Sequence, residues 1–408
     1  MSISIRLWGY RHVEGEFDMN NQAQKFLLIA TTVLAFIWST TANAVPAFAR
    51  KHELNCSACH TAYPQLSATG RQFKENGYRF LTAEKASNAL EISDFLQLEE
   101  HVPISGILVA RPYDEKDSGE RKLRALHEVE IIVAGNIARN WSGYFEIEAE
   151  DETGFELELA PAVLSYNHSK EFNIQLVYGP TFWADSYGII GDHFRLTRGH
   201  VGAIDQRFGG ADADGRFRAT RQNVGVFGRF SDRFFYNVNY SGKAEDAEGE
   251  KASIASGLFN VDITDGIMLG AFVMDGTDEA TDRDFNRTGL QFQGDFTDLR
   301  IQALYITASD DRDALDPRGP GEDDNDTASL QAFYTFRDDT LRPTFVPLIR
   351  FDTYETNDGA DSFDEVTLNI GYYFNQNIKA YFEYWDRYDA PTAVQEDSRI
   401  TLQFVAAF

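Results

Sequence analysis

Both cysteines of this 408-residue chain lie within five positions of each other, in the stretch NCSACHT at 55–61. Cys56 and Cys59 are three positions apart and His60 follows directly, which is the spacing of c-type haem attachment. One helical turn would bring both sulfurs within reach of the porphyrin vinyl groups, and the adjacent imidazole would then bind the iron as the proximal ligand. The sequence therefore predicts one covalent haem c on Cys56, Cys59 and His60.

Two other uses of a cysteine pair fit this sequence less well. A zinc site would need two further ligands at finger-like spacing, and the chain has no second cysteine pair. A thioredoxin-like redox disulfide would need a βαβ context, which the flanking sequence does not provide.

A secretory signal peptide is predicted ahead of this motif. The apolar run at 26–38 follows Lys25 and precedes Ala42-Asn43-Ala44, a small-residue cleavage site, and it is too short for a helical membrane span. Export to the periplasm, where c-type haem is attached, agrees with the motif. The expected segments are an upstream extension at 1–18, the signal peptide at 19–44, a monohaem cytochrome segment at 45–95 and a porin-like barrel at 96–408.

Composition excludes some partners and leaves two fold classes open. The formal net charge of −27 argues against a nucleic-acid partner, whose phosphates would repel the chain. After the signal, no apolar stretch is long enough for a membrane helix, so a soluble β protein and an outer-membrane barrel both remain.

The periodicity favours the barrel. From about residue 100 the chain repeats segments of alternating character, such as 366–374 and 398–408, with one apolar and one polar face. A strand between lipid and an aqueous lumen requires this pattern. We count sixteen such segments, joined alternately by short turns and by longer acidic loops such as 275–286 and 309–327. The chain ends on Phe408, which resembles the C-terminal signal of barrel assembly. The expected fold is an all-β transmembrane antiparallel barrel of about 16 strands behind a small α-helical haem segment.

One connection, at 184–218, is longer than connections without a functional role usually are, and we expect it to fold into the lumen as a constriction. Asp212 and Asp214, before Gly215, offer a fragment of a calcium loop, although an ordinary acidic turn explains them better.

Because successive side chains of a strand point to opposite faces, the parity of the residue number shows which face a side chain takes. This parity places six carboxylates on the inner wall of three neighbouring strands. Such a stripe concentrates cations, unless basic residues on facing strands, such as Arg350 or Lys379, balance it as in an ordinary polar lumen. The predicted stripe consists of Glu128, Glu130, Glu146, Glu148, Glu156 and Glu158.

The distal haem ligand is less well marked. Beyond the signal the only methionines are Met268 and Met274, and no methionine follows the motif at the distance usual in short soluble cytochromes. Parity places His101 and Met268 on the polar face near the periplasmic end of their strands. His101 ranks first, then Met268, then His52, and five-coordinate iron is a further alternative. A methionine ligand would raise the haem potential.

The run VPAFARKHELNCSACHTAYPQLSATGRQFKENGYRF at 45–80 resembles the outer-membrane cytochrome–porin fusions, best known from iron(II)-oxidising bacteria. The resemblance implies covalent haem on Cys56 and Cys59, proximal His60, and a barrel behind the haem segment. Members of that family often carry a methionine before the first cysteine, where this chain has Leu54 and Asn55. Leu66, Phe73, Tyr78 and Phe80 are candidates to cover the porphyrin, because so short a segment needs the cofactor and the barrel wall to complete its core.

Three functional hypotheses follow. The first is an outer-membrane cytochrome–porin that passes electrons from an extracellular reduced metal donor, Fe(II) above all, to a periplasmic soluble c-type cytochrome, possessing iron(II) oxidase activity if Fe(II) is its substrate. The second is a diffusion porin whose haem segment acts as a periplasmic plug or sensor. The third is a cytochrome–porin that uses another donor or runs in reverse. In each, the barrel lies in outer-membrane lipid and the haem segment at its periplasmic side or in its lumen.

Overall fold

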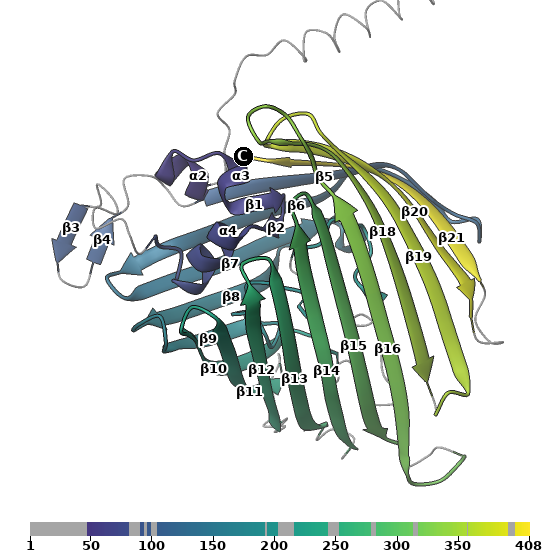
Figure 1. The fold of residues 1–408 in the computed structure, drawn as a ribbon. Helices are drawn as coiled ribbons and strands as arrows, with labels where there is room; N and C mark the ends of the chain where they lie inside the picture. The colour runs from purple at the N-terminus through teal and green to yellow at the C-terminus, as the bar shows by residue number, and fades with distance from the viewer. Residues whose placement is uncertain are drawn as a thin grey trace, which may run out of the picture. The chain divides into compact units, whose positions relative to one another are not determined.

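The chain folds as a closed antiparallel β-barrel with a short helical segment at one mouth (Figure 1). No helix in the described part of the chain has the length and apolarity that a membrane crossing requires. The predicted extension and signal peptide, His101, and the Asp212–Gly215 fragment lie outside the described residues. The computed structural model describes residues 47–80, 90–93, 96–98, 104–191, 194–202, 216–243, 253–278, 283–312, 317–356, 358–390 and 396–408.

Within these residues, sixteen strands form the barrel, which confirms the predicted fold. Each strand pairs with its neighbour in sequence, and the last strand closes on the first; β16 and β17 are parts of one strand interrupted at Thr335. The strands are β5 Ile104–Lys116, β6 Arg121–Ala138, β7 Trp141–Glu150, β8 Glu158–Asn167, β9 Asn173–Gly179, β10 Arg221–Phe230, β11 Phe234–Lys243, β12 Ser253–Thr264, β13 Ile267–Asp278, β14 Arg283–Phe296, β15 Leu299–Asp311, β16 Glu322–Tyr334, β17 Phe336–Arg337, β18 Pro343–Thr356, β19 Asp361–Tyr373, β20 Ile378–Asp389 and β21 Asp397–Ala407.

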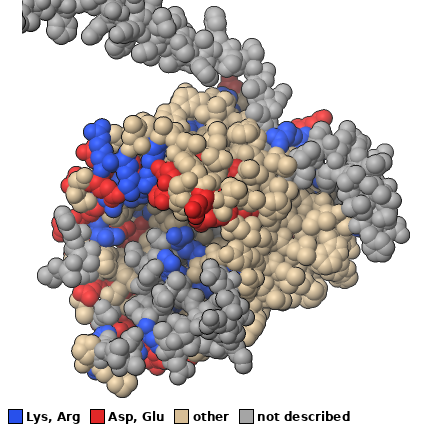
Figure 2. Space-filling view, turned by 180° about the vertical axis from the view of Figure 1, so that it is seen from behind, with Lys and Arg blue, Asp and Glu red and all other residues tan. Residues whose placement is uncertain are grey.

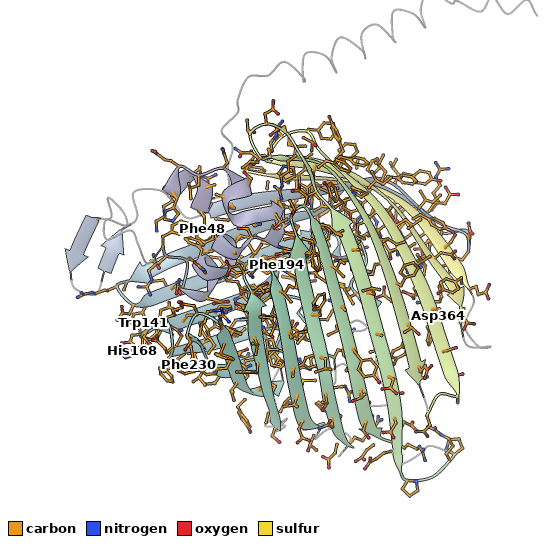
Figure 3. All side chains as sticks on the ribbon, viewed as in Figure 1. Phe48, Trp141, His168, Phe194, Phe230 and Asp364 are labelled. Carbon is orange, nitrogen blue, oxygen red and sulfur yellow. The ribbon has the colours of Figure 1, made fainter. Side chains whose placement is uncertain are left out.

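The outer face is apolar and carries aromatic side chains near the short turns. Figure 2 shows a broad uncharged surface, with most charged side chains gathered toward one side of the view. Trp141, His168 and Phe230 lie close together at the short-turn ends of β7 to β10 (Figure 3). An aromatic girdle at the membrane interface is typical of outer-membrane barrels. Exposed members near the short turns are Trp141, Phe230, Phe234, Phe296, Tyr334, Phe336, Phe345, Tyr372, Phe374 and Phe408.

The turns alternate as predicted, but the long loops are shorter than expected. Two residues separate β6 from β7, and two separate β14 from β15. Both ends of each acidic stretch predicted as a loop are strand; β15 and β16, for example, stay paired as far as Asp311 and Glu322. Arginines offset the acidic side chains there; the guanidinium of Arg287, for example, lies 2.7 Å from Asp310 Oδ1.

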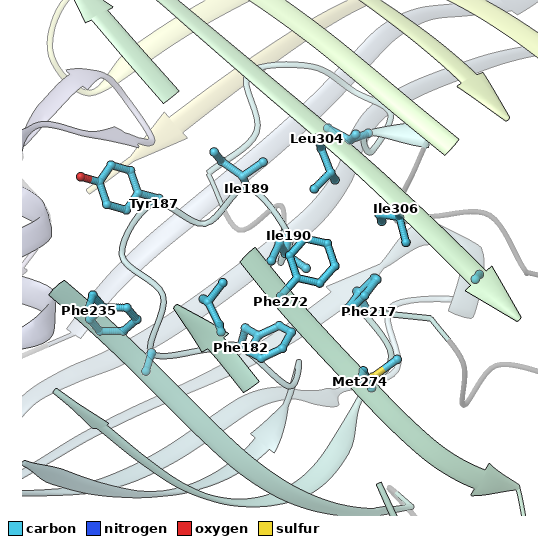
Figure 4. Close-up of a cluster of buried hydrophobic side chains, with 14 of the residues drawn as sticks. Phe182, Tyr187, Ile189, Ile190, Phe217, Phe235, Phe272, Met274, Leu304 and Ile306 are labelled. Carbon is cyan, nitrogen blue, oxygen red and sulfur yellow. The ribbon is translucent and has the colours of Figure 1, made fainter. Parts of the chain in front are cut away.

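The connection between β9 and β10, here called the inner loop, folds into the lumen as predicted. Its apolar side chains pack against inward-facing side chains of β10 to β15 (Figure 4). This part of the lumen is therefore an apolar core, although the alternating pattern predicts a polar inner face. The cluster includes Phe182, Tyr187, Ile189, Ile190 and Phe217 of the inner loop, and Phe235, Phe272, Met274, Leu304 and Ile306 of the strands.

The N-terminal segment at 47–80, here called the plug segment, enters the mouth of the barrel at the short-turn end. Its elements are α2 Ala47–His52, α3 Cys56–Cys59, β1 His60–Ala62, β2 Gln65–Leu66 and α4 Ala68–Glu75. A two-stranded sheet of β3 Leu90–Ser93 and β4 Leu96–Leu98 follows before the barrel begins.

Candidate functional site

The two cysteines lie on the single helical turn that the spacing predicts. Cys56 and Cys59 are the first and last residues of α3, and both are free and partly buried. The next helix is tied to this turn, because Ser67 Oγ donates to the Ala58 carbonyl at 3.0 Å and the Ser67 amide donates to the Cys59 carbonyl at 2.8 Å. The hydroxyl of Ser67 also caps α4 by accepting from the Gly70 amide. The C-x-x-C turn and α4 are therefore one unit.

Burial keeps these thiols protonated in the absence of a bound partner. It raises the pKa of Cys56 to about 11, with a further contribution from Cys59, and it also raises the pKa of Cys59. Thiols in this state are poor nucleophiles at neutral pH, so the surroundings do not resemble those of a redox-active dithiol.

The imidazole of His60 is held in one orientation. His60 begins β1, and its Nδ1 lies 2.9 Å from the carbonyl oxygen of Pro64. A carbonyl only accepts hydrogen bonds, so Nδ1 carries the proton and Nε2 keeps its lone pair. Burial lowers the pKa of His60 to about 4, which keeps the ring neutral at pH 7. A neutral ring with Nδ1–H bound to a backbone carbonyl is the usual form of a metal-binding histidine.

Basic residues of the barrel hold the plug segment by hydrogen bonds to its backbone and side chains. Arg300 of β15 donates to Thr61 Oγ1, Gln65 Oε1 and the Leu66 carbonyl, each at 3.0 Å. Lys379 of β20 donates to the Tyr63 carbonyl at 3.0 Å. The anchored residues follow His60 directly in sequence, so the C-terminal side of the motif is fixed to the barrel wall.

The plug segment also anchors the inner loop. Lys74 of α4 donates to the carbonyls of Trp183 and Asp185 at 2.6 and 2.8 Å. Glu75 forms an ion pair with Arg229 of β10, with Nε and Oε2 at 2.6 Å. The segment is thus bound at several points within the lumen.

A cavity of about 830 Å³ separates the plug segment from one wall of the barrel. It is in the size range of sites that bury most of a small-molecule ligand. Cys56, Cys59 and His60 all line it. The four apolar residues expected to cover a porphyrin, Leu66, Phe73, Tyr78 and Phe80, line the same cavity.

The facing wall is acidic, as parity predicts. Strand register places Glu128 opposite Glu150 and Glu130 opposite Glu148, and Glu146 lies two residues farther toward the short turns, opposite Ile132. Glu156 is the exception, because β8 begins only at Glu158 and Glu156 lies in the exposed loop before it. The carboxylates that line the cavity, here called the glutamate stripe, are Glu128, Glu130, Glu146, Glu148, Glu150 and Glu158.

Basic residues line other parts of the cavity: Arg111, Arg195, Arg198, Arg218 and Lys379. Lys379 lines the cavity, where its amine donates to the Tyr63 carbonyl, but Arg350 does not face the stripe. Its guanidinium Nε lies 2.8 Å from Asp352 Oδ2, and other nitrogens donate to the inner loop. Arg195 and Arg198 belong to the inner loop, so strand parity does not place them, but the expectation that this loop enters the lumen does.

The candidates for distal ligand are placed differently from one another. Met268 is 1% exposed and belongs to the apolar cluster around the inner loop, and it does not line the cavity. His52 lines the cavity, in edge contact with Phe73 and Phe80. His200 of the inner loop lines it as well, a position that only the length of that loop could have suggested.

These residues fit a haem c. The set consists of two free thiols on one turn, a neutral imidazole whose Nδ1 is already bonded, and aromatic side chains around a cavity that all of them line.

Comparison with known proteins finds structures similar to the barrel. No protein-family model and no curated protein matches this sequence. An anion-selective porin from Comamonas acidovorans is structurally similar, with 13% identity, a TM-score of 0.57, and coverage of 75% of this chain and 98% of the porin. The chain has the fold of an outer-membrane porin. Salmonella typhi OmpF, solved in complex with daunomycin, is similar at 16% identity and a TM-score of 0.55, covering 77% of this chain and 98% of OmpF.

A third porin-type barrel, OmpT of Vibrio cholerae, matches at 13% identity and a TM-score of 0.55 over 76% of this chain and 97% of OmpT. At such identities the likeness concerns the fold alone. The porin-type fold agrees with the aromatic girdle and with the alternation of short turns and longer connections.

Proposed function

We propose that this chain is an outer-membrane cytochrome–porin that transfers electrons from an extracellular reduced metal donor, above all Fe(II), to a periplasmic soluble c-type cytochrome. One observation carries the proposal: the C-x-x-C-H motif and six wall glutamates line the same cavity. A haem-binding motif without access from outside would have no route to an extracellular donor.

The motif supplies the binding chemistry. Cys56 and Cys59 would hold haem c by thioethers, and His60 Nε2 would bind the iron. When bound, the haem supplies one-electron transfer. The Pro64 carbonyl holds the His60 ring and raises the basicity of Nε2, while Phe73, Tyr78 and Phe80 exclude water from one side of the cavity.

The barrel would give an extracellular donor access to the C-x-x-C-H motif. The cavity extends from the motif to Glu150 and Glu158, which lie at the strand ends remote from the short turns. Because an outer-membrane barrel crosses an apolar band of ~25 Å, a donor that enters along this cavity avoids the need for a second haem. Clustered carboxylates raise the local concentration of cations, which favours Fe²⁺ over an anionic donor.

The test is reduction by Fe(II). The mature protein, purified in detergent with its haem oxidised, is mixed with excess Fe(II) in a stopped-flow instrument, and an anionic reductant of similar potential serves as the control. The proposal expects reduction of the haem by Fe(II), faster than by the anion at low ionic strength. Unchanged haem absorption at excess Fe(II) would eliminate the iron(II) function.

A second candidate is a diffusion porin with a haem-bearing plug or sensor. The contacts of Arg300 and Lys379 with the plug segment favour it, because they fix that segment in the barrel mouth. This candidate expects no reduction by external donors and a change of conductance with haem redox state. A cytochrome–porin using another donor, or running in reverse, would instead reduce or oxidise its haem with extracellular compounds other than iron.

A further inference from the structure

We propose that His127, Glu128 and Glu150 form a divalent-cation site on the inner barrel wall, at the outer end of the glutamate stripe. One ligand atom from each of the three residues lies within 4.8 Å of the others. His127 and Glu128 belong to β6, and Glu150 is the last residue of β7 (Figure 1). The inference rests on the proposed function only in naming this cation as the electron donor.

A strand irregularity brings the histidine to this site. Val109 of β5 pairs with Glu128, but the next register pair joins Arg111 to Arg124, so three residues of β6 lie opposite a single residue of β5. This bulge breaks the alternation of inward and outward side chains. As a result, the neighbours His127 and Glu128 are both buried, at 3% and 9% exposure.

The histidine is oriented for binding through one nitrogen. His127 Nδ1 lies 2.8 Å from Asp151 Oδ1. A guanidinium nitrogen of Arg124, which can only donate, lies 3.1 Å from the same Nδ1, so the carboxylate and the guanidinium compete for this atom. In the tautomer whose Nδ1 donates to Asp151, Nε2 carries the lone pair, which is the carboxylate–histidine–metal arrangement of many metal sites. Arg124 pairs with Asp151 and Glu152, so its charge offsets these two outer carboxylates.

In the part of the chain that the structure describes, the carboxylates of Glu128 and Glu150, unlike those of Asp151 and Glu152, form no close ion pair with an arginine. Glu128 is nine-tenths buried and lines the cavity, and its register partner across the sheet is Glu150. The next pair on the same face of the strands, Glu130 and Glu148, is acidic too. Within the described residues, no salt bridge at 4.0 Å or less joins Glu128 or Glu150 to a basic side chain, although Arg111 is near enough to attract both carboxylates. Like charges opposite each other in a sheet are destabilising, and buried carboxylates need a compensating charge. A bound divalent cation would supply it.

The ligand types narrow the choice of cation. One imidazole with two carboxylates suits Fe²⁺, Mn²⁺ and Zn²⁺ better than Ca²⁺ or Mg²⁺, which prefer all-oxygen sites. From this site the remaining glutamates continue along the cavity toward the C-x-x-C-H motif. Fe²⁺ would therefore bind here first, as the incoming electron donor, before it approaches the haem.

The test uses Mn²⁺, which is redox-inert here and binds such sites more weakly than Fe²⁺. The full mature protein in detergent is titrated with Mn²⁺, and the free ion is followed by electron paramagnetic resonance. The variant is E128Q/E150Q. The control is E365Q, because the Glu365 carboxylate is held by Arg387 and Trp385 away from the stripe. Heat-modifiable gel migration verifies that each barrel is folded.

We expect one Mn²⁺ per chain, at least tenfold weaker binding in E128Q/E150Q, and a change of less than twofold in E365Q. Absence of Mn²⁺ binding by the unaltered protein, or equal affinity in the folded double variant, would overturn the site and indicate that protons satisfy these carboxylates. Haem reduction by Fe(II) in the same preparation separates the two proposals. Reduction without Mn²⁺ binding removes only the site, whereas Mn²⁺ binding without reduction removes only the iron(II) function.

Discussion

The Cys59 carbonyl oxygen lies 2.1 Å from the position that a Cβ on Gly70 would occupy. Only glycine allows α4 to approach the C-x-x-C turn this closely. The hydrogen bonds of Ser67 to Ala58 and Cys59 depend on the same approach. Gly70 is therefore part of the unit formed by the C-x-x-C turn and α4, although it has no side chain that could contact a ligand.

Replacing Gly70 by alanine should loosen α4 from the motif. The added methyl group meets backbone, which cannot yield as a flexible side chain would, so we expect a cost of about 1–3 kcal/mol. Limited proteolysis of the plug segment in the folded barrel measures the effect, and cleavage should be faster than in the unaltered protein. The control is G257A, because a Cβ there meets only Val273 Cγ2 at 3.9 Å. Equal protection of G70A and G257A would refute this explanation.

Loss of Arg300 should release the plug segment. Arg300→Met removes three hydrogen bonds to 61–66 and leaves Asp295 without its closest cation. Breaking a buried pair in this way costs about 3–5 kcal/mol. In planar bilayers we expect more frequent or larger channel openings than in the unaltered protein. R312M, which removes an ion pair with Asp323 at the outer rim, is the control. Identical conductance of R300M and the unaltered protein would show that other contacts hold the segment.

The anchoring of the inner loop should depend on pH through Asp185. Burial raises the pKa of Asp185 from 3.8 to about 6. A carboxyl group whose pKa is raised on folding contributes stability below pH 3.8, and this contribution is lost as the pH rises through about 6. The pKa of Lys74, lowered by burial to about 8, keeps that amine charged over this range.

We therefore expect the free energy of unfolding to fall by roughly 1–3 kcal/mol between pH 4 and 6.5 from this group. Since asparagine does not ionise, the decrease should be smaller in D185N than in the unaltered protein. Denaturant unfolding at both pH values measures the difference. A decrease of equal size in both proteins would assign the pH dependence to other groups.

The haem spectrum should respond to His52 and not to Met268. Met268 packs in the apolar cluster, so M268L should leave the haem absorption unchanged and lower stability by less than about 1.5 kcal/mol. His52 lines the cavity, so H52Q should alter the spin state of the iron if this histidine is the distal ligand. Loss of the low-spin spectrum in M268L would instead restore the methionine as ligand.

The sequence predicts the barrel well because strand parity is local. The faces of β19 and β21 follow directly from alternation, and the glutamates of β6 and β7 face inward as parity requires. Parity fails where the strand is irregular: His127 is buried at a bulge that no local signal marks. The expectation of a polar inner face also fails, since the apolar residues Leu304 and Ile306 face inward against the inner loop. The path of that loop depends on tertiary packing.

For the candidate site, the spacing of Cys56, Cys59 and His60 predicts the helical turn, and the aromatic residues after it predict the lining of the cavity. What could not be read from the sequence are the contacts between distant segments. Arg300 and Lys379 reach the plug segment from strands more than 200 residues away, and their charges alone do not reveal what they bind.

The most direct test of the account is the mass and location of the mature protein made in a bacterium able to attach c-type haem. We predict that the purified chain is coloured, that its mass exceeds that of the polypeptide by one haem, and that it fractionates with the outer membrane. C56A/C59A should fractionate in the same way but lack the added mass. A colourless chain of unmodified mass, or recovery with the soluble periplasmic contents, would contradict the account.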